Sequence, residues 1–166
     1  MRIIPPSNLN CLLTTLVLFS WPAAGKAQEA DPAPEQAAVM PKDSSAALAS
    51  EAWAALDGQN YAVARQSAER CRDLYGAQAA EMQSKLSALP DKESAHQQWA
   101  LNDVGTSVFI LGRVAEAEGK KEEAMAAYRD VVDNYTYSQC WDEQGWFWQP
   151  AVAAKERIAF LTLEQE

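Results

Sequence analysis

The chain has 166 residues, a length that suits one domain, and its 14 Lys and Arg against 23 Asp and Glu give a net charge of −9. This acidic balance disfavours a nucleic-acid binder, because affinity for the phosphate backbone comes from Lys and Arg side chains that displace counterions. Three cysteines are too few for a disulfide-rich scaffold.

Residues 1–27 are predicted to be a signal peptide. Arg2 supplies a basic start, and the apolar run that begins at Cys11 is too short to span a bilayer. Gly25 and Ala27 are small, as signal peptidases require, so we expect cleavage after Ala27. An uncleaved anchor is the alternative. Cleavage would leave a soluble protein, exported to the periplasm or the extracellular space.

Residues 28–42 are predicted to be a disordered linker or spacer. This segment has three prolines, three acidic residues and almost no large apolar side chain. It therefore cannot bury enough surface to offset the entropy lost on ordering the chain.

Residues 43–166 are predicted to form an all-α domain of five to six helices. Helix-forming residues dominate this region, and it shows no strand-like alternation of β-branched residues. The first helix is expected to begin at Ser44 or Ser45 and to end at Asp57 and Gly58, where glycine disfavours continuation.

The next helices follow from similar signals. One is expected to begin near Tyr61, to be kinked or stopped at Gly76, and to be followed by further helix as far as Pro90. Ser94 and Gln97 have the spacing of a capping box, in which the serine hydroxyl and the glutamine side chain each bond a free backbone amide. A long helix is expected to follow.

Two apolar stripes share one sequence offset. Each member of the first stripe lies 60 positions before its counterpart, and the pairs are Ala64 and Ala124, Ala68 and Tyr128, Cys71 and Val131, and Tyr75 and Tyr135. Four matched positions at a single offset indicate a repeated helix.

The second copy resembles a tetratricopeptide repeat (TPR). The TPR pattern has Leu-Gly in its first helix, Gly at the turn, and Ala, an aromatic and an apolar residue in its second, and the chain matches it at Leu111, Gly112, Gly119, Ala124, Tyr128 and Val131. The first copy matches loosely. The resemblance implies a short solenoid of helical hairpins, in which Gly112 and Ala124 let two helices approach and Tyr128 fills the next gap.

The chain is also similar to a group of exported bacterial TPR-like proteins through ALNDVG (Ala100–Gly105) and QCWDEQGWFW (Gln139–Trp148). Some members of that group are labelled beta-glucanases. The residues do not support this activity here, because the Glu-x-Asp-x-x-Glu pattern of one β-glucanase family is absent. Ser107 lacks the context of a nucleophile elbow, and His96, the only histidine, is expected to be exposed and uninvolved. We predict no enzymatic activity.

A tryptophan-rich loop is expected between the second repeat and a final capping helix that Pro150 can start. Its indoles could plug the open end of the solenoid or stack on a ligand. We expect Trp141 and Trp146 to be structural plugs, and Trp148 to be partly exposed and to contact a ligand.

Cys71 and Cys140 remain after the predicted cleavage. In an oxidising compartment they either form a disulfide or stay as packed thiols. One histidine and two distant cysteines fall short of a zinc site, and the sequence has neither a calcium-binding loop nor a phosphate loop. No metal or cofactor is expected.

The other ligand-binding candidates lie on the long helix. The first helix of a TPR hairpin lines the concave surface, so the resemblance implies that Asn102, Phe109 and Arg113 meet a ligand. Asn102 could pair with a peptide backbone, and Arg113 could hold a carboxylate through two parallel hydrogen bonds. A solvated helix edge is the alternative.

Together these observations predict a secreted or periplasmic, non-enzymatic TPR-like module that binds a protein or peptide. The resemblance carries most of this prediction. The alternative is an accessory protein that binds glucan or cell-wall polysaccharide through its clustered indoles.

Overall fold

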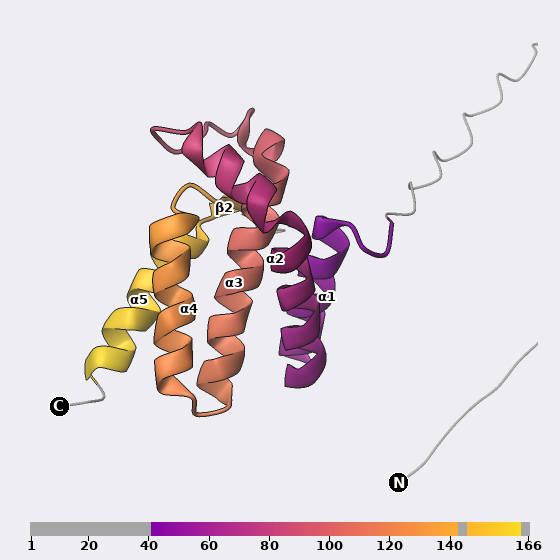
Figure 1. The fold of residues 1–166 in the computed structure, drawn as a ribbon. Coiled ribbons are helices and arrows are strands. Elements are labelled where there is room, and N and C mark those ends of the chain that lie inside the picture. Colours follow the sequence, from indigo (N-terminus) through magenta and orange to yellow (C-terminus); the bar gives the residue numbers. More distant parts are fainter. Residues whose placement is uncertain (1–40, 143–145, 164–166) are drawn as a thin grey trace, which may run out of the picture. The chain divides into compact units, whose positions relative to one another are not determined.

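The computed structural model describes residues 41–142 and 146–163, with the backbone alone for Asp142 and Trp146. The predicted signal peptide and almost all of the predicted linker lie outside these residues. The described chain consists of five α-helices, a short 3-10 helix and two short strands, which confirms the all-α prediction (Figure 1).

Helix α1 spans Ser45–Asp57 and helix α2 spans Tyr61–Ser84. Each begins at a side chain that accepts a hydrogen bond from a first-turn amide: Ser44 for α1 and Asn60 for α2. The predicted start and end of α1 are therefore confirmed.

The predicted break at Gly76 and the predicted helix up to Pro90 are both wrong. Helix α2 passes through Gly76 and ends at Ser84. A single glycine costs a helix only about 1 kcal/mol. Tyr75 packs on the core and Ala79 is fully buried, so tertiary contacts on both sides of the glycine offset that cost.

The predicted capping box does not form. Ser94 makes no side-chain cap, and its backbone amide instead donates to Asp91 Oδ1 at 2.9 Å. The chain then forms the 3-10 helix η1 (Ala95–Gln98), which leads directly into α3 (Trp99–Ala117). The long helix therefore forms as expected, but a 3-10 helix precedes it in place of a capping box.

Helix α4 spans Lys121–Asn134, and α5 spans Pro150–Leu163 with the proline at its first position, as predicted. The tryptophan-rich segment between them was expected to be a loop, which is wrong. It forms an antiparallel pair of strands, β1 (Cys140–Asp142) and β2 (Trp146–Trp148).

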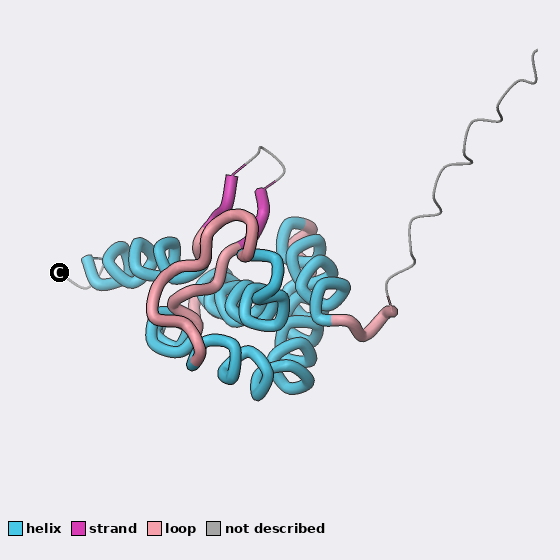
Figure 2. Tube along the Cα trace, turned by 90° about the horizontal axis from the view of Figure 1, so that it is seen from above, coloured by secondary structure: helices cyan, strands magenta, loops and turns pink. Residues whose placement is uncertain are grey.

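The helices pack in two layers. Helix α2 contacts both α1 and α3, α4 contacts both α3 and α5, and α3 also contacts α1 and α5 directly. Helices α1, α3 and α5 therefore form one layer, with α2 and α4 against it (Figure 1). Seen from above, the β-hairpin projects from the helices (Figure 2).

Helices α3 and α4 approach closely at Gly112. A Cβ atom on this glycine would lie 2.4 Å from a ring carbon of Tyr128, which is fully buried. The Tyr128 hydroxyl donates to Glu116 Oε2 at 2.8 Å, and Ala124, one turn before Tyr128, is also fully buried. All three repeat residues, Gly112, Ala124 and Tyr128, thus contribute to packing.

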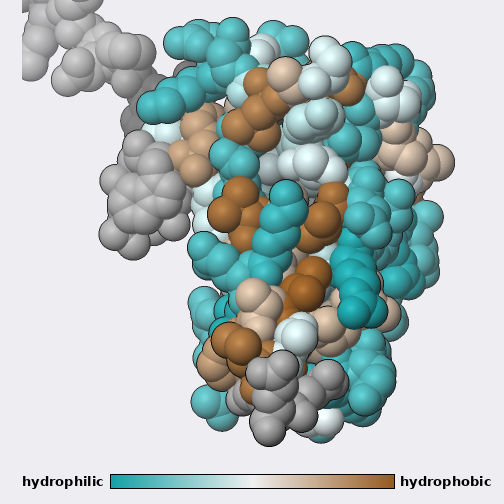
Figure 3. All heavy atoms as spheres, turned by 90° about the vertical axis from the view of Figure 1, so that its left-hand side faces the viewer, coloured by the Kyte–Doolittle hydropathy of each residue, from teal (hydrophilic) through white to brown (hydrophobic). Residues whose placement is uncertain are grey.

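The last helix leaves apolar side chains on the surface. Val152, Phe160 and Leu163 of α5 are exposed. Figure 3, which views the molecule from the left of Figure 1, shows apolar residues separated by polar ones on this face. Within the described residues, no helix combines the length and apolar character needed to cross a membrane.

Candidate functional site

Two adjoining cavities lie along the layer formed by α1, α3 and α5. The first, of about 540 Å³, lies between α1, η1, α3 and the hairpin, and the second, of about 420 Å³, lies between α1, α3, α5 and the hairpin. Both are lined by Trp53, Cys140 and Trp141. The two cavities are therefore neighbours, and we call the pair of them the aromatic groove.

Successive side chains of each hairpin strand point to opposite faces of the hairpin. Cys140 pairs with Trp148 across the ladder, and Trp141 pairs with Phe147. The first pair faces the helices, since Trp148 packs on the core and Cys140 contacts Thr106 of α3. The Trp141 and Phe147 rings pack edge to face, with centroids 5.2 Å apart.

The expected plug role of Trp141 is wrong, whereas Trp148 is partly exposed, as expected. Trp141 is 63% exposed, so it is not a plug. Trp148 is half-buried between Trp53 and Phe109, with ring centroids at 5.9 Å and 5.1 Å. The hairpin register causes the difference between the two residues, because Trp148 belongs to the pair that faces the helices and Trp141 belongs to the other pair. The predicted plug at Trp146 concerns a side chain outside the described residues.

Phe109, Arg113 and Trp148, three of the four predicted ligand contacts, line the second cavity. Phe109 is only 3% exposed and forms part of the core beneath it. Arg113 is exposed, and its guanidinium pairs with no acidic side chain among the described residues. Its neighbour Arg157 is already held by Glu116.

Asn102, the fourth predicted contact, lines the first cavity, but its amide is engaged in the fold. Its Nδ2 donates to the Ala95 carbonyl and its Oδ1 accepts from the Gln139 backbone amide, both at 2.8 Å. The side chain is buried. Asn102 therefore joins η1 to the start of the hairpin, and the geometry does not support its predicted hydrogen bond to a peptide backbone.

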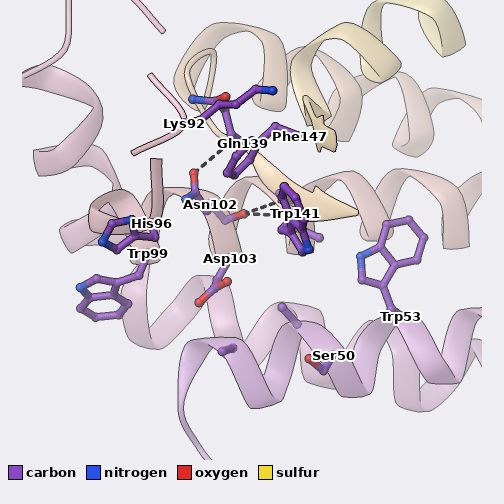
Figure 4. A pocket seen from close by; sticks show the side chains of 14 residues that line it. Ser50, Trp53, Lys92, His96, Trp99, Asn102, Asp103, Gln139, Trp141 and Phe147 are labelled. Carbon is purple, nitrogen blue, oxygen red and sulfur yellow. Dashed lines mark hydrogen bonds between the residues drawn. The ribbon is translucent and has the colours of Figure 1, made fainter. Parts of the chain in front are cut away.

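Asp103 was not singled out from the sequence, and it is the carboxylate that lines the first cavity (Figure 4). Its Oδ2 accepts a hydrogen bond from Ser45 Oγ at 2.5 Å. Burial raises the pKa of this carboxyl above its ordinary value of 3.8, against the opposing effect of Ser45. Lys92 and His96, both exposed, line the same cavity. Its hydrogen-bond donor lies 58 positions away in the sequence, so the local pattern of the long helix does not show this environment.

The raised pKa of Asp103 predicts a pH-dependent effect of Asp103→Asn. The native state binds more protons than the unfolded state between the unfolded and folded pKa values, so stability falls as pH rises through that interval. The asparagine variant should therefore melt at a higher temperature than the native protein at neutral pH, and the difference should vanish near pH 3, below both pKa values.

Thermal unfolding across this pH range, with Asp133→Asn on the exposed face of α4 as the control, measures the effect. A lower melting temperature for Asp103→Asn at neutral pH would show that the ionised carboxylate stabilises the fold.

Cys71 and Cys140 are free thiols in the structure and no disulfide joins them. Of the two interpretations left open by the sequence, the structure has the packed thiols. Cys71 Sγ donates to the Ser45 carbonyl at 3.7 Å, and Cys140 Sγ contacts Thr106 Oγ1. Burial raises the pKa of Cys71 to about 11 and that of Cys140 to about 12, so both are neutral at physiological pH.

The described residues thus form an all-α protein with an aromatic groove on its α1, α3 and α5 layer. Comparisons with protein-family models, with curated proteins and with solved structures find no match for this chain.

Proposed function

We propose that the chain is an exported, non-enzymatic TPR-like module that binds a peptide segment of another protein in the aromatic groove. The observation that carries this proposal is that two neighbouring cavities share Trp53, Cys140 and Trp141 in their lining. Two neighbouring cavities lined by several elements suit successive side chains of an extended chain better than they suit one compact ligand.

The helix arrangement supports the TPR-like part of the proposal. In stacked helical hairpins, the first helices of successive hairpins pack side by side and line one surface. Helices α1, α3 and α5 have these contacts, with α2 and α4 as the second helices. The offset of 60 residues between the matched stripes of α2 and α4 is consistent with two hairpins of this kind.

The lining of the groove supports a peptide as the ligand. Indole and phenyl rings offer apolar contact for side chains, and Arg113 at the second cavity offers a guanidinium that could pair with a carboxylate. Asp103 and Glu156 are the acidic residues among the described lining of the two cavities, and they belong to different cavities. This lining supports binding more than glycoside hydrolysis, which uses two carboxylates on either side of one bond.

Selection of a displayed random peptide library on the purified chain tests the proposal. We expect selected peptides to bind with micromolar dissociation constants and to raise or quench tryptophan emission. Arg113→Ala should weaken acidic members of the selected set by about tenfold, the loss of one charge-assisted contact. Arg129→Ala, an exposed arginine on α4, is the matched control. Equal effects of the two variants would remove the groove as the peptide site.

A polysaccharide remains the second candidate because two indoles beside the groove are exposed. Trp141 is 63% exposed and Trp99 is 40% exposed, so each presents a flat ring surface to which a sugar could stack. Titration with soluble glucans, followed by tryptophan emission, distinguishes the two. A saturable response to glucan, lost in Trp141→Ala and accompanied by no enrichment of peptides, would favour the polysaccharide.

A further inference from the structure

The first cavity combines aromatic walls with a carboxylate in its lining. Trp53 on α1, Trp99 at the start of α3, and Trp141 and Phe147 on the hairpin contribute the walls. Figure 4 shows Asp103 below Asn102, with Trp99 and His96 on one side of it and Trp141 and Trp53 on the other. The volume of the first cavity, about 540 Å³, is large enough for a small organic group.

The carboxylate of Asp103 has a hydrogen-bond donor but no cationic partner. Ser45 donates to one oxygen, and no Lys, Arg or His of the described chain forms a salt bridge with either oxygen. Burial raises the pKa of the carboxyl, which means that its ionised form is poorly compensated. A bound cation would supply the missing compensation.

The walls indicate what kind of cation fits. The faces of Trp and Phe rings attract positive charge, and they do so most strongly for ammonium groups that carry apolar substituents and are weakly hydrated. A strongly hydrated metal ion is a poorer fit, because a metal site needs several oxygen, nitrogen or sulfur ligands. The described part of the chain has no group of three or more His, Cys, Asp or Glu residues that could hold a metal ion.

We propose that the first cavity binds an alkylammonium group, with its positive charge against Asp103 and its methyl or methylene groups against the aromatic side chains that line the cavity. Free quaternary ammonium compounds and the lysine or methyllysine side chains of a peptide share this chemistry. The inference goes beyond peptide binding in the groove, since it holds for a free ligand as well.

Choline and dimethylbutanol test the charge requirement. In dimethylbutanol, a carbon atom replaces the nitrogen of choline, so the two molecules have the same shape and differ in charge. We expect choline to bind with a dissociation constant of about 1 mM or tighter, and dimethylbutanol to bind at least about tenfold more weakly. Calorimetry and tryptophan emission on the full chain measure both. Equal affinity for choline and dimethylbutanol would overturn the proposal.

Three variants assign the interaction to residues. Asp103→Asn should weaken choline by about tenfold or more and leave dimethylbutanol unchanged, with circular dichroism confirming that the variant is folded. Lys92→Ala removes a like charge from the same cavity and should leave choline affinity unchanged or slightly higher. Glu156→Gln, in the second cavity, is the matched control for loss of a carboxylate. Unchanged choline affinity in Asp103→Asn, or its loss in Lys92→Ala, would contradict the assignment.

Two lysine compounds distinguish a peptide side chain from a free ammonium compound. They are lysine amide acetylated on its α-nitrogen, and the same compound trimethylated on its side-chain nitrogen. Tighter binding of either compound than of choline, with the same dependence on Asp103, would identify a peptide side chain as the ligand. The reverse order would identify a free ammonium compound. Both results support the alkylammonium site, whereas failure of all three cations overturns it without bearing on Arg113 and the second cavity.

Discussion

Gly112→Ala is expected to lower the free energy of unfolding by about 1 to 3 kcal/mol. The new methyl group would lie within 2.4 Å of the Tyr128 ring, and this ring is fully buried, so it has no free space into which to move. The higher helix propensity of alanine, worth up to about 1 kcal/mol, offsets only part of this strain. Urea denaturation of the purified variant measures the change.

Gly76→Ala is the matched control, and it should have the opposite sign. Gly76 also lies inside a helix, but a Cβ atom there would meet only Arg72 Cγ, at 4.0 Å. We therefore expect this variant to gain about 0.5 to 1 kcal/mol. If both variants lose stability equally, the crowding at Tyr128 is not the cause. The double variant Gly112→Ala with Tyr128→Leu should lose less stability than the two single variants lose together, since the smaller leucine makes room for the new methyl group.

Trp148→Ala should have the largest effect of the tryptophan substitutions, about 2 to 4 kcal/mol. Its indole packs between Trp53 and Phe109, so its removal leaves a cavity where the hairpin meets α1 and α3. Trp141→Ala should change the free energy of unfolding by less than about 0.5 kcal/mol, because this indole is 63% exposed. Parallel urea titrations compare the two. An equal loss of stability would mean that Trp141 packs in solution.

Helix positions were predictable where apolar periodicity and capping residues agreed. Ser44 and Gly58 identify the limits of α1, and Pro150 identifies the start of α5, because each acts through its own backbone and nearest neighbours. At Gly76 the prediction is wrong because core contacts, which the sequence does not display, override the local preference of glycine. The same holds for Ser94, whose backbone amide bonds to Asp91 instead of forming the expected cap.

The site was harder to predict than the helices because its geometry comes from the hairpin. The two strands have three residues each, too few to show a period of two. Their register decides which tryptophan is buried, and no local signal in the sequence specifies that register. Phe109, Arg113 and Trp148 were nevertheless identified, and the structure brings them to one cavity. Asp103 was missed because its donor, Ser45, lies on another helix.

The contact between Trp148 and Trp53 has a consequence for how the domain unfolds. In an ordinary solenoid each repeat touches only its neighbours, so the ends can fray while the middle stays folded. Here a side chain close to the last helix reaches the first helix across 95 positions of sequence. This contact couples the first and last parts of the helical domain, so the helices should unfold in one cooperative transition. It also increases the contact order, which slows folding compared with an array held together by local contacts alone.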